Sequence, residues 1–204
     1  MLILASASPR RQELLRNARI LFKVQPADVP EVRGDGEPPE AFAQRLAREK
    51  ARAIFNLLRP PAGTFVLGAD TVVVVDGEVL GKPADEADAA RMLQLLSGRQ
   101  HQVITGVCLL GQPNTANERE AGNGKRGTVV EHVRCETTQV FFAPLSDDDI
   151  QDYINTGEPM DKAGAYGIQG MASRWIPRIE GDYFNVVGLP VALVCRMLRE
   201  QGAL

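Results

Sequence analysis

Residues 65–80 read FVLGADTVVVVDGEVL, which combines two apolar runs with a tight turn. Residues 65–69 and 72–75 are apolar and rich in valine, as is typical of strands buried inside a sheet. Asp76-Gly77 is a strong signal for a two-residue hairpin, and residues 78–80 would form the returning strand. The segment therefore predicts a buried antiparallel hairpin.

Asp70 interrupts the apolar residues of this hairpin. A carboxylate at such a position is costly unless it is paired, hydrogen-bonded or bound to a metal. With Asp76-Gly77 as the turn, Thr71 lies opposite Lys82, and Asp70 lies beside that pair. We therefore expect a carboxylate and a lysine to converge where the hairpin leaves the core, either as a structural ion pair or as part of a site.

Helix and strand patterns alternate on both sides of the hairpin. Strands are expected at 2–5, 20–24, 102–110 and 129–142, helices at 9–17, 40–58, 85–96, 146–155 and 190–200, loops at 26–39 and 157–170, and mixed strand and turn at 176–187. This order predicts an α/β protein with a mixed sheet. The length of 204 residues suggests a single domain. The polar segment 111–128 is expected to be an exposed loop.

The segment Ser6-Ala-Ser8-Pro-Arg10-Arg11 has the features of a helix start that binds an anion. Ser8 is a favourable N-cap, and proline suits the first helical position. Unpaired backbone N–H groups and the positive end of the helix dipole attract anions there, whereas the two arginines oppose that dipole. An anionic ligand would replace this penalty with bidentate hydrogen bonds. An ordinary capped helix with solvated arginines is the alternative.

Lys50 lies on the apolar stripe of the helix expected at 40–58, between Leu46 and Ile54. A lysine on such a stripe either extends along apolar surface to water or reaches into a cleft. Both interpretations fit the pattern equally well.

The segment from Glu158 to Gly170 is punctuated by glycines at 164, 167 and 170, which would allow the backbone to approach a ligand closely. Gln169 offers a hydrogen-bond donor and an acceptor together, which suits reading the edge of a nucleobase. A tight surface loop is the alternative.

Composition excludes several classes of function. The net charge of −3 argues against general binding to nucleic acid, which needs a basic surface. Two histidines and three widely spaced cysteines support neither a Ser-His-Asp triad, nor a zinc site, nor a disulfide framework, so a reducing cytoplasm fits best. The sequence shows no phosphate-binding GxxxxGK[ST] motif, signal peptide or apolar run near the ~18 residues of a membrane span.

The remaining candidates are cations and acids: Arg10, Arg11, Lys50 and Lys82 with Asp70 and Glu31. Cationic side chains with a few carboxylates and no histidine suit a polyphosphate bound through a divalent metal. Spacing alone leads no further.

The sequence resembles the Maf family of nucleoside triphosphate pyrophosphatases, which is named for an association with septum formation. The matching segments cover nearly the whole chain: LASASPRRQELL (4–15), RLAREKA (45–51), GADTVV (68–73), GKP (81–83), LSGRQHQVITGV (96–107), GEPMDKAGAYGIQG (157–170) and NVVGLP (185–190). The resemblance implies an elongated mixed α/β fold with two lobes around a central cleft, similar to inosine triphosphate pyrophosphatase. It also implies hydrolysis of a nucleoside triphosphate to the monophosphate and pyrophosphate with Mg²⁺, or with Mn²⁺ or Co²⁺.

The resemblance assigns roles to particular residues. Asp70 matches the family's proton acceptor, and Glu31 with Asp70 matches its metal-associated acids. Phosphate binding is expected from Ser8, Arg11, Lys50 and Lys82. Arg10, Thr71 and Gln169 match the subgroup that acts on dTTP, UTP and modified uridine triphosphates, rather than the subgroup that prefers 7-methyl-GTP.

The resemblance further implies a homodimer, while the cysteine usage, net charge and short apolar runs predict a cytoplasmic protein with no nucleic-acid polymer or membrane partner. Two other functions stay open at this point. One is a nucleotide-binding regulator of cell division that acts through a protein partner. The other is a house-cleaning enzyme for deaminated purine nucleotides, suggested by the shared fold.

Overall fold

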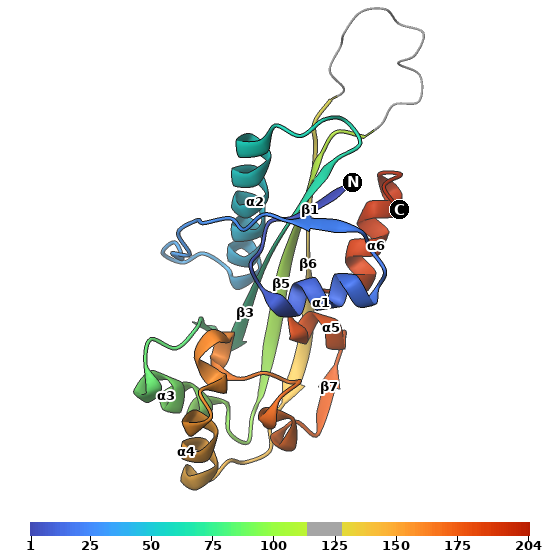
Figure 1. The fold of residues 1–204 in the computed structure, drawn as a ribbon. Helices are drawn as coiled ribbons and strands as arrows, with labels where there is room; N and C mark the ends of the chain where they lie inside the picture. The colour runs from blue at the N-terminus through green and yellow to red at the C-terminus, as the bar shows by residue number, and fades with distance from the viewer. Residues whose placement is uncertain (114–127) are drawn as a thin grey trace, which may run out of the picture.

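A computed structural model of the chain describes residues 1–113 and 128–204. Within these residues, seven strands form one mixed sheet in the order β2-β1-β3-β5-β6-β7, with β4 paired to β3. The strands are β1 (Leu2–Leu4), β2 (Phe22–Val24), β3 (Phe65–Val75), β4 (Glu78–Leu80), β5 (Gln100–Gly111), β6 (Val130–Phe141) and β7 (Arg178–Glu180). The molecule is elongated along the long strands β3, β5 and β6 (Figure 1). The predicted mixed α/β fold is confirmed.

The hairpin predicted at Asp76-Gly77 is present. β3 and β4 pair antiparallel, with Val75 opposite Glu78. Both turn residues have positive φ, 48° and 82°, as a type I′ turn requires. One detail of the prediction is wrong: residues 65–75 form a single strand, because Asp70 and Thr71 continue the ladder with β5 instead of interrupting it.

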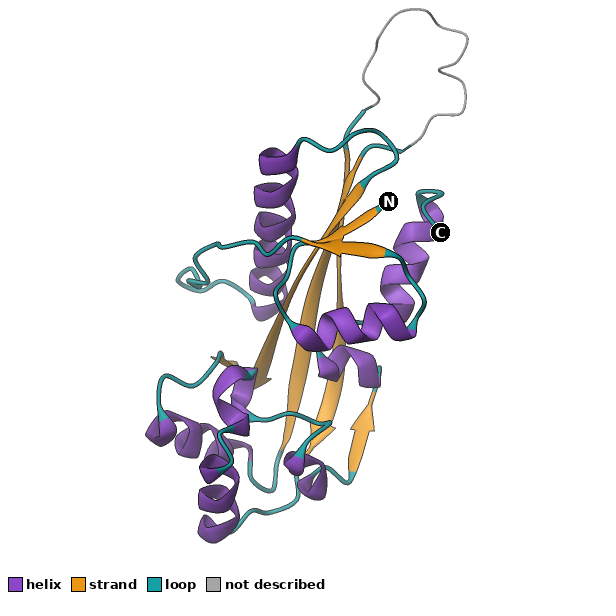
Figure 2. Cartoon of the chain, viewed as in Figure 1, coloured by secondary structure: helices purple, strands orange, loops and turns teal. Residues whose placement is uncertain are grey.

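All the predicted helices are present. They are α1 (Pro9–Asn17), α2 (Pro39–Leu58), α3 (Glu86–Leu96), α4 (Asp147–Asn155) and α6 (Val191–Glu200). Figure 2 shows α2 and α6 beside one half of the sheet, α3 and α4 together at its other end, and α1 near the middle. Among the helices of residues 1–113 and 128–204, none is long and apolar enough to cross a membrane.

The connecting segments differ more from the sequence predictions. The segment 176–187 contains β7 but also a short helix, α5 (Tyr183–Val187), which was not predicted. Its N-cap is Asp182, whose side chain accepts a hydrogen bond from the Phe184 N–H. The expected loop at 157–170 contains two 3-10 helices, η1 (Glu158–Asp161) and η2 (Ala163–Ala165), and η3 (Met171–Trp175) follows it. Residues 114–127 of the expected loop at 111–128 lie outside the described residues.

Helix α2 packs onto the sheet through two glycines. A Cβ atom at Gly68 would lie 2.0 Å from the Ala47 carbonyl oxygen, and one at Gly106 would lie 2.3 Å from that of Ala43. Side chains at these sheet positions would therefore push the helix away. This close approach sets the distance between α2 and the residues that follow Gly68 on the same face of β3.

Two apolar clusters flank the middle of β3. Phe65, Leu67 and Ala69 pack with β1, α1 and α6 in one cluster. Val73 and Val75 pack with α3, α4 and the 160–176 region in the other. Asp70 and Thr71 lie between the two clusters, where side chains of α1 and α2 also reach the strand.

Candidate active site

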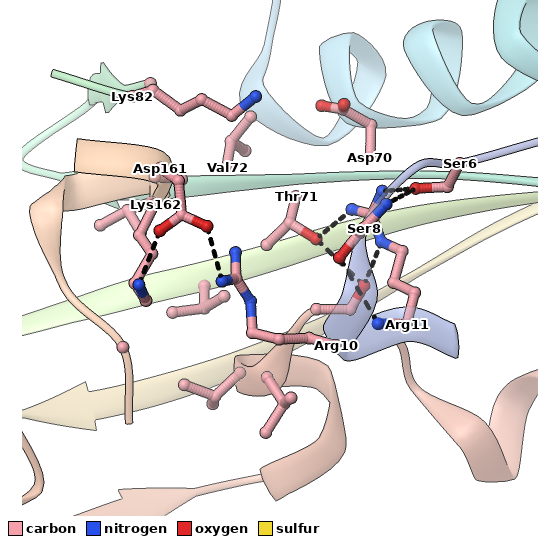
Figure 3. Close-up of a pocket in the computed structure, with 18 of the residues that line it drawn as sticks. Ser6, Ser8, Arg10, Arg11, Asp70, Thr71, Val72, Lys82, Asp161 and Lys162 are labelled. Atoms are coloured by element: carbon pink, nitrogen blue, oxygen red, sulfur yellow. Dashed lines mark hydrogen bonds and ion pairs between the residues drawn. The ribbon is translucent and has the colours of Figure 1, made fainter. Parts of the chain in front are cut away.

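A cavity of about 840 Å³ lies at this junction. That volume is within the range of small-molecule sites, about 300–1,000 Å³. Every residue that the sequence singled out lines it: Ser8, Arg10, Arg11, Glu31, Lys50, Asp70, Thr71, Lys82 and Gln169. They come from the start of α1, the loop before α2, helix α2, strand β3, the segment after β4 and the loop that follows α4. Figure 3 shows how several of them face the same space.

Lys50 joins the two acids of the site. Its Nζ lies 2.6 Å from Asp70 Oδ1 and 2.5 Å from Glu31 Oε1. The side chains of Lys50 and Asp70 are only 10% and 9% exposed, whereas that of Glu31 is 48% exposed. Lys50 therefore reaches into the cleft, and the alternative of a lysine that extends to bulk water is wrong. The packing of α2 against Gly68 brings the two side chains together.

The two acids have opposite pKa shifts. Burial raises the pKa of Asp70, although the charges of Lys50 and Arg11 pull it downward. Burial also acts upward on Glu31, but its hydrogen bond to Lys50 and the nearby positive charges hold its pKa below the usual range. Of the two carboxylates, Asp70 is therefore the stronger base, and Glu31 is the one that more readily stays ionised.

Lys82 is not the partner of Asp70 that the hairpin register suggested. The β3–β4 ladder ends at Val73 and Leu80, because the Gly81 carbonyl turns away to accept a hydrogen bond from Gly164 N at 2.9 Å. Lys82 is exposed, and no carboxylate of the described residues lies within ion-pair distance of it. Figure 3 shows Lys82 and Asp70 along one wall of the cavity, on either side of Val72.

Arg11 is tied to the protein by four hydrogen bonds. Its Nε donates to the Gly188 carbonyl at 2.8 Å, and Nη1 donates to the Ala69 carbonyl at 2.9 Å and to Ser6 Oγ at 3.2 Å. Nη2 donates to Thr71 Oγ1 at 2.9 Å. Burial lowers its pKa from the ordinary arginine value, partly offset by the charge of Asp70. The guanidinium thus places a half-buried positive charge beside Asp70 and joins α1, β3 and the α5–α6 connection.

Ser8 occupies the predicted N-cap. Its Oγ accepts the Arg11 backbone N–H at 3.4 Å, and Pro9 stands at the first helical position. The start of α1 forms part of the wall of the cavity. The backbone geometry of the expected anion site is therefore present.

Arg10 forms an ion pair with Asp161, a residue that the sequence patterns did not single out. Its Nη1 lies 3.0 Å from Asp161 Oδ2, and Lys162 Nζ lies 2.6 Å from Asp161 Oδ1 (Figure 3). Burial acts upward on the pKa of Asp161, but the bonds to Lys162 and Arg10 outweigh it and hold that pKa below the usual range. The ion pair links α1 to η1 across the cavity. In the sequence, the only hint of this role was the pair of adjacent charges, Asp161-Lys162, within the glycine-rich segment.

Thr71 and Gln169, the other two residues expected to set specificity, differ in their surroundings. Thr71 Oγ1 lies 3.0 Å from Thr105 Oγ1 and also accepts from Arg11, so its hydroxyl is engaged within the protein. Gln169 is exposed and lines the cavity. Its amide makes no hydrogen bond with another described residue, so it is available to a ligand.

Glu31 and Asp70 are also the acids able to hold a divalent metal. In the part of the chain that the structure describes, no group of three or more His, Cys, Asp or Glu side chains could hold a metal by itself. Mg²⁺ is commonly bound by one or two carboxylates together with substrate phosphates. The two acids therefore fit a metal shared with a phosphorylated ligand, and do not fit a protein-only cage.

The chain is similar to known proteins over nearly its whole length. The family described as Maf-like protein matches residues 1–201. A protein of Koribacter versatilis (strain Ellin345) named dTTP/UTP pyrophosphatase is 62% identical over 203 residues, covering 100% of this chain and 95% of its own. A protein of the same name from Symbiobacterium thermophilum (strain DSM 24528 / JCM 14929 / IAM 14863 / T) is 54% identical over 201 residues, covering 98% of this chain and 94% of its own.

Among solved structures, the chain is similar to a nucleoside-triphosphatase / dITP/XTP pyrophosphatase from Mycobacterium abscessus ATCC 19977 / DSM 44196. The TM-score is 0.40 at 16% identity, and the match covers 98% of this chain and 96% of the other.

Proposed function

The chain belongs to the Maf family, and from that premise we propose that it hydrolyses nucleoside triphosphates to the nucleoside monophosphate and pyrophosphate. The proposed substrates are dTTP, UTP and modified uridine triphosphates, which agrees with the name dTTP/UTP pyrophosphatase of relatives up to 62% identical over the whole chain. The observation that carries the proposal is the buried Asp70, held by Lys50 in a cavity lined by further cations. The chain would thus be a hydrolase acting on an acid anhydride in nucleotide metabolism.

In the proposed reaction, Asp70 accepts a proton from a water molecule as the water oxygen attacks the α-phosphorus. The bond between the α-phosphorus and the α–β bridging oxygen breaks, and pyrophosphate leaves. Phosphoryl chemistry of this kind depends mainly on positioning and charge neutralisation. Lys50 is buried and Arg11 half-buried near Asp70, and Lys82 lies along the same wall, so these three cations are placed to offset the developing negative charge. Ser8, at the start of α1, would bind a terminal phosphate.

A divalent metal would be held by Glu31 and Asp70 together with the phosphates of the substrate. We propose Mg²⁺, with Mn²⁺ or Co²⁺ as substitutes. When bound, the metal would supply positive charge to the phosphate oxygens. Lys50 holds the two acids near each other, with its Nζ 2.5 Å from Glu31 Oε1 and 2.6 Å from Asp70 Oδ1.

Base choice is proposed to depend on Gln169, Arg10 and Thr71. The free amide of Gln169 can pair with the O4 and N3–H edge of uracil or thymine. Arg10, held by Asp161 at the edge of the cavity, is placed to approach the base or sugar. Thr71 acts through Arg11, because its hydroxyl is bonded to that guanidinium and not directed at free cavity space.

A panel of triphosphates with Mg²⁺ tests this function. We expect pyrophosphate as the product and kcat/KM for dTTP and UTP about tenfold or more above CTP and GTP, since an unpaired buried group costs about 1–3 kcal/mol. Uracil 5-substituents should be tolerated. Release of orthophosphate would contradict the bond assignment. Preference for 7-methyl-GTP would contradict the assigned specificity residues, and preference for ITP would favour the deaminated-purine function.

We also propose a single two-lobed domain that acts as a homodimer in the cytoplasm, with no nucleic-acid polymer or membrane as partner. The net charge of −3 gives little repulsion between two copies. Static light scattering at micromolar concentration should give about twice the monomer mass, and a monomer mass at every concentration would contradict the proposal.

A further inference from the structure

The segment 167–171, which contains Gln169, is attached to the protein by a pair of side chains. Gly167 N donates to Tyr153 Oη at 3.1 Å, and Met171 N donates to Glu158 Oε2 at 3.1 Å. The two side chains are themselves joined, because Tyr153 Oη donates to Glu158 Oε1 at 2.8 Å. Gln169 therefore sits midway between two attachment points, two residues from each.

The space around the two glycines shows how closely the segment lies on these side chains. A Cβ atom at Gly170 would lie 2.0 Å from Glu158 Oε1 and 2.4 Å from Glu158 Cδ. A Cβ atom at Gly167 would lie 2.7 Å from Lys162 Cε. The Glu158 carboxylate thus occupies the space that a side chain at 170 would need, and such a side chain would displace it.

Tyr153 is rigid and keeps a fixed hydrogen-bond polarity. It is fully buried on α4 and packs edge-on against Trp175, with ring centroids 5.6 Å apart. The start of α4 is fixed in turn by a capping box between Ser146 and Asp149. Burial raises the pKa of the Tyr153 phenol above its ordinary value, so the group stays protonated and donates to Glu158 while its oxygen accepts from Gly167.

We propose that Tyr153 and Glu158 are positioning residues that set base selectivity by fixing Gln169. The proposal rests on the function proposed above, in which Gln169 reads the base. Tyr153 is absent from the cavity lining, so it acts through the 167–171 segment and not by contact with the ligand, whereas Glu158 is part of that lining. Loss of either attachment would let the amide of Gln169 adopt other orientations, and a flipped amide also accepts the edge of cytosine.

The test is kinetic analysis of Tyr153→Phe with dTTP and CTP. We expect the ratio of kcat/KM for dTTP over CTP to fall about three- to tenfold, through a higher KM for dTTP. The reason is that phenylalanine removes both the hydrogen bond from Gly167 N and the hydrogen bond to Glu158. The kcat for dTTP should stay within about twofold, since the Lys50–Asp70 pair is untouched. Tyr183→Phe is the matched control, the same change at an exposed tyrosine outside the cavity lining, and should leave the ratio unchanged.

Glu158 provides a second and independent pair of variants. Glu158→Ala should lower the selectivity ratio as Tyr153→Phe does, whereas Glu158→Gln keeps an acceptor for Met171 N and should stay closer to the wild type. In a Gln169→Ala background, Tyr153→Phe should cause no further loss of selectivity, because both changes act through one side chain.

A lower melting temperature with an unchanged selectivity ratio in Tyr153→Phe and Glu158→Ala would overturn the inference and leave a merely structural role. Wild-type turnover of dTTP with pyrophosphate release reports separately on the proposed function. A wild-type enzyme that prefers dTTP, with variants that keep that preference, would contradict the positioning role alone.

Discussion

Asp70→Asn is expected to lower kcat for dTTP by about 10²–10⁴-fold, the range typical of a lost general base. The amide oxygen can still accept from Lys50, and Lys50 keeps its bond to Glu31, so the cavity should retain its shape. Binding of a non-hydrolysable dTTP analogue, measured by calorimetry, should stay within about tenfold of the wild type, because the basic residues are intact. Pyrophosphate release gives kcat directly.

Asp76→Asn is the control for Asp70→Asn. Asp76→Asn makes the same chemical change at the exposed end of β3, in a left-handed turn position that asparagine tolerates, and should leave kcat unchanged. Turnover of Asp70→Asn near the wild-type rate would exclude Asp70 as the base. If Asp70→Asn lacks turnover but restores a division phenotype in cells, the regulator function is favoured over the enzyme.

The pH dependence follows from the raised pKa of Asp70. A general base must be ionised to act. As the pH is lowered, kcat/KM of the wild type should therefore begin to fall at a pH above that at which an ordinary aspartate becomes protonated. The contribution of Asp70 to folding stability changes with pH in the opposite direction to its effect on kcat/KM. The folded state holds this proton more tightly than the unfolded state, so stability falls as pH rises through the interval between the ordinary and the raised pKa. Asp70→Asn should remove this pH-dependent part of the free energy of unfolding.

Local signals in the sequence predicted the framework of the site well. Asp76-Gly77 fixed the β3–β4 register because a type I′ turn demands positive φ at both positions, and Ser8-Pro9 fixed the start of α1. Both signals act over a few residues. The short helix α5 escaped prediction because its five residues give no periodic pattern.

The pairing inside the site could not be predicted from local patterns. Asp70 pairs with Lys50 instead of Lys82 because α2 sits against Gly68 and Gly106, a tertiary contact that no hairpin register contains. Likewise, the contacts of Arg11 with Gly188 and Thr71 join segments 177 and 60 residues apart. The sequence indicated which residues gather in the cavity, but the structure was needed to say which of them touch.

Lys50→Met is expected to lower kcat/KM for dTTP by about 10²-fold, since a charge-assisted bond to a buried group contributes about 1.5–3 kcal/mol. Methionine preserves much of the aliphatic stem while it removes the ammonium. Without that cation, the pKa of Asp70 rises further, because Lys50 is the largest of the influences that lower it. The acidic limb of the kcat/KM profile should therefore move to higher pH than in the wild type.

The ion-pair geometry also predicts a loss of folding stability for this variant. Asp70 would stay buried with no cation at 2.6 Å, so unfolding by urea should show a loss of about 2 kcal/mol at neutral pH. Because the unpaired carboxyl takes up a proton more readily in the folded state, this loss should shrink as pH falls. Lys23→Met, at an exposed lysine of β2 outside the cavity lining, is the matched control. A Lys50→Met protein that is more stable than the wild type and equally active would show that the buried ammonium has no part in the reaction.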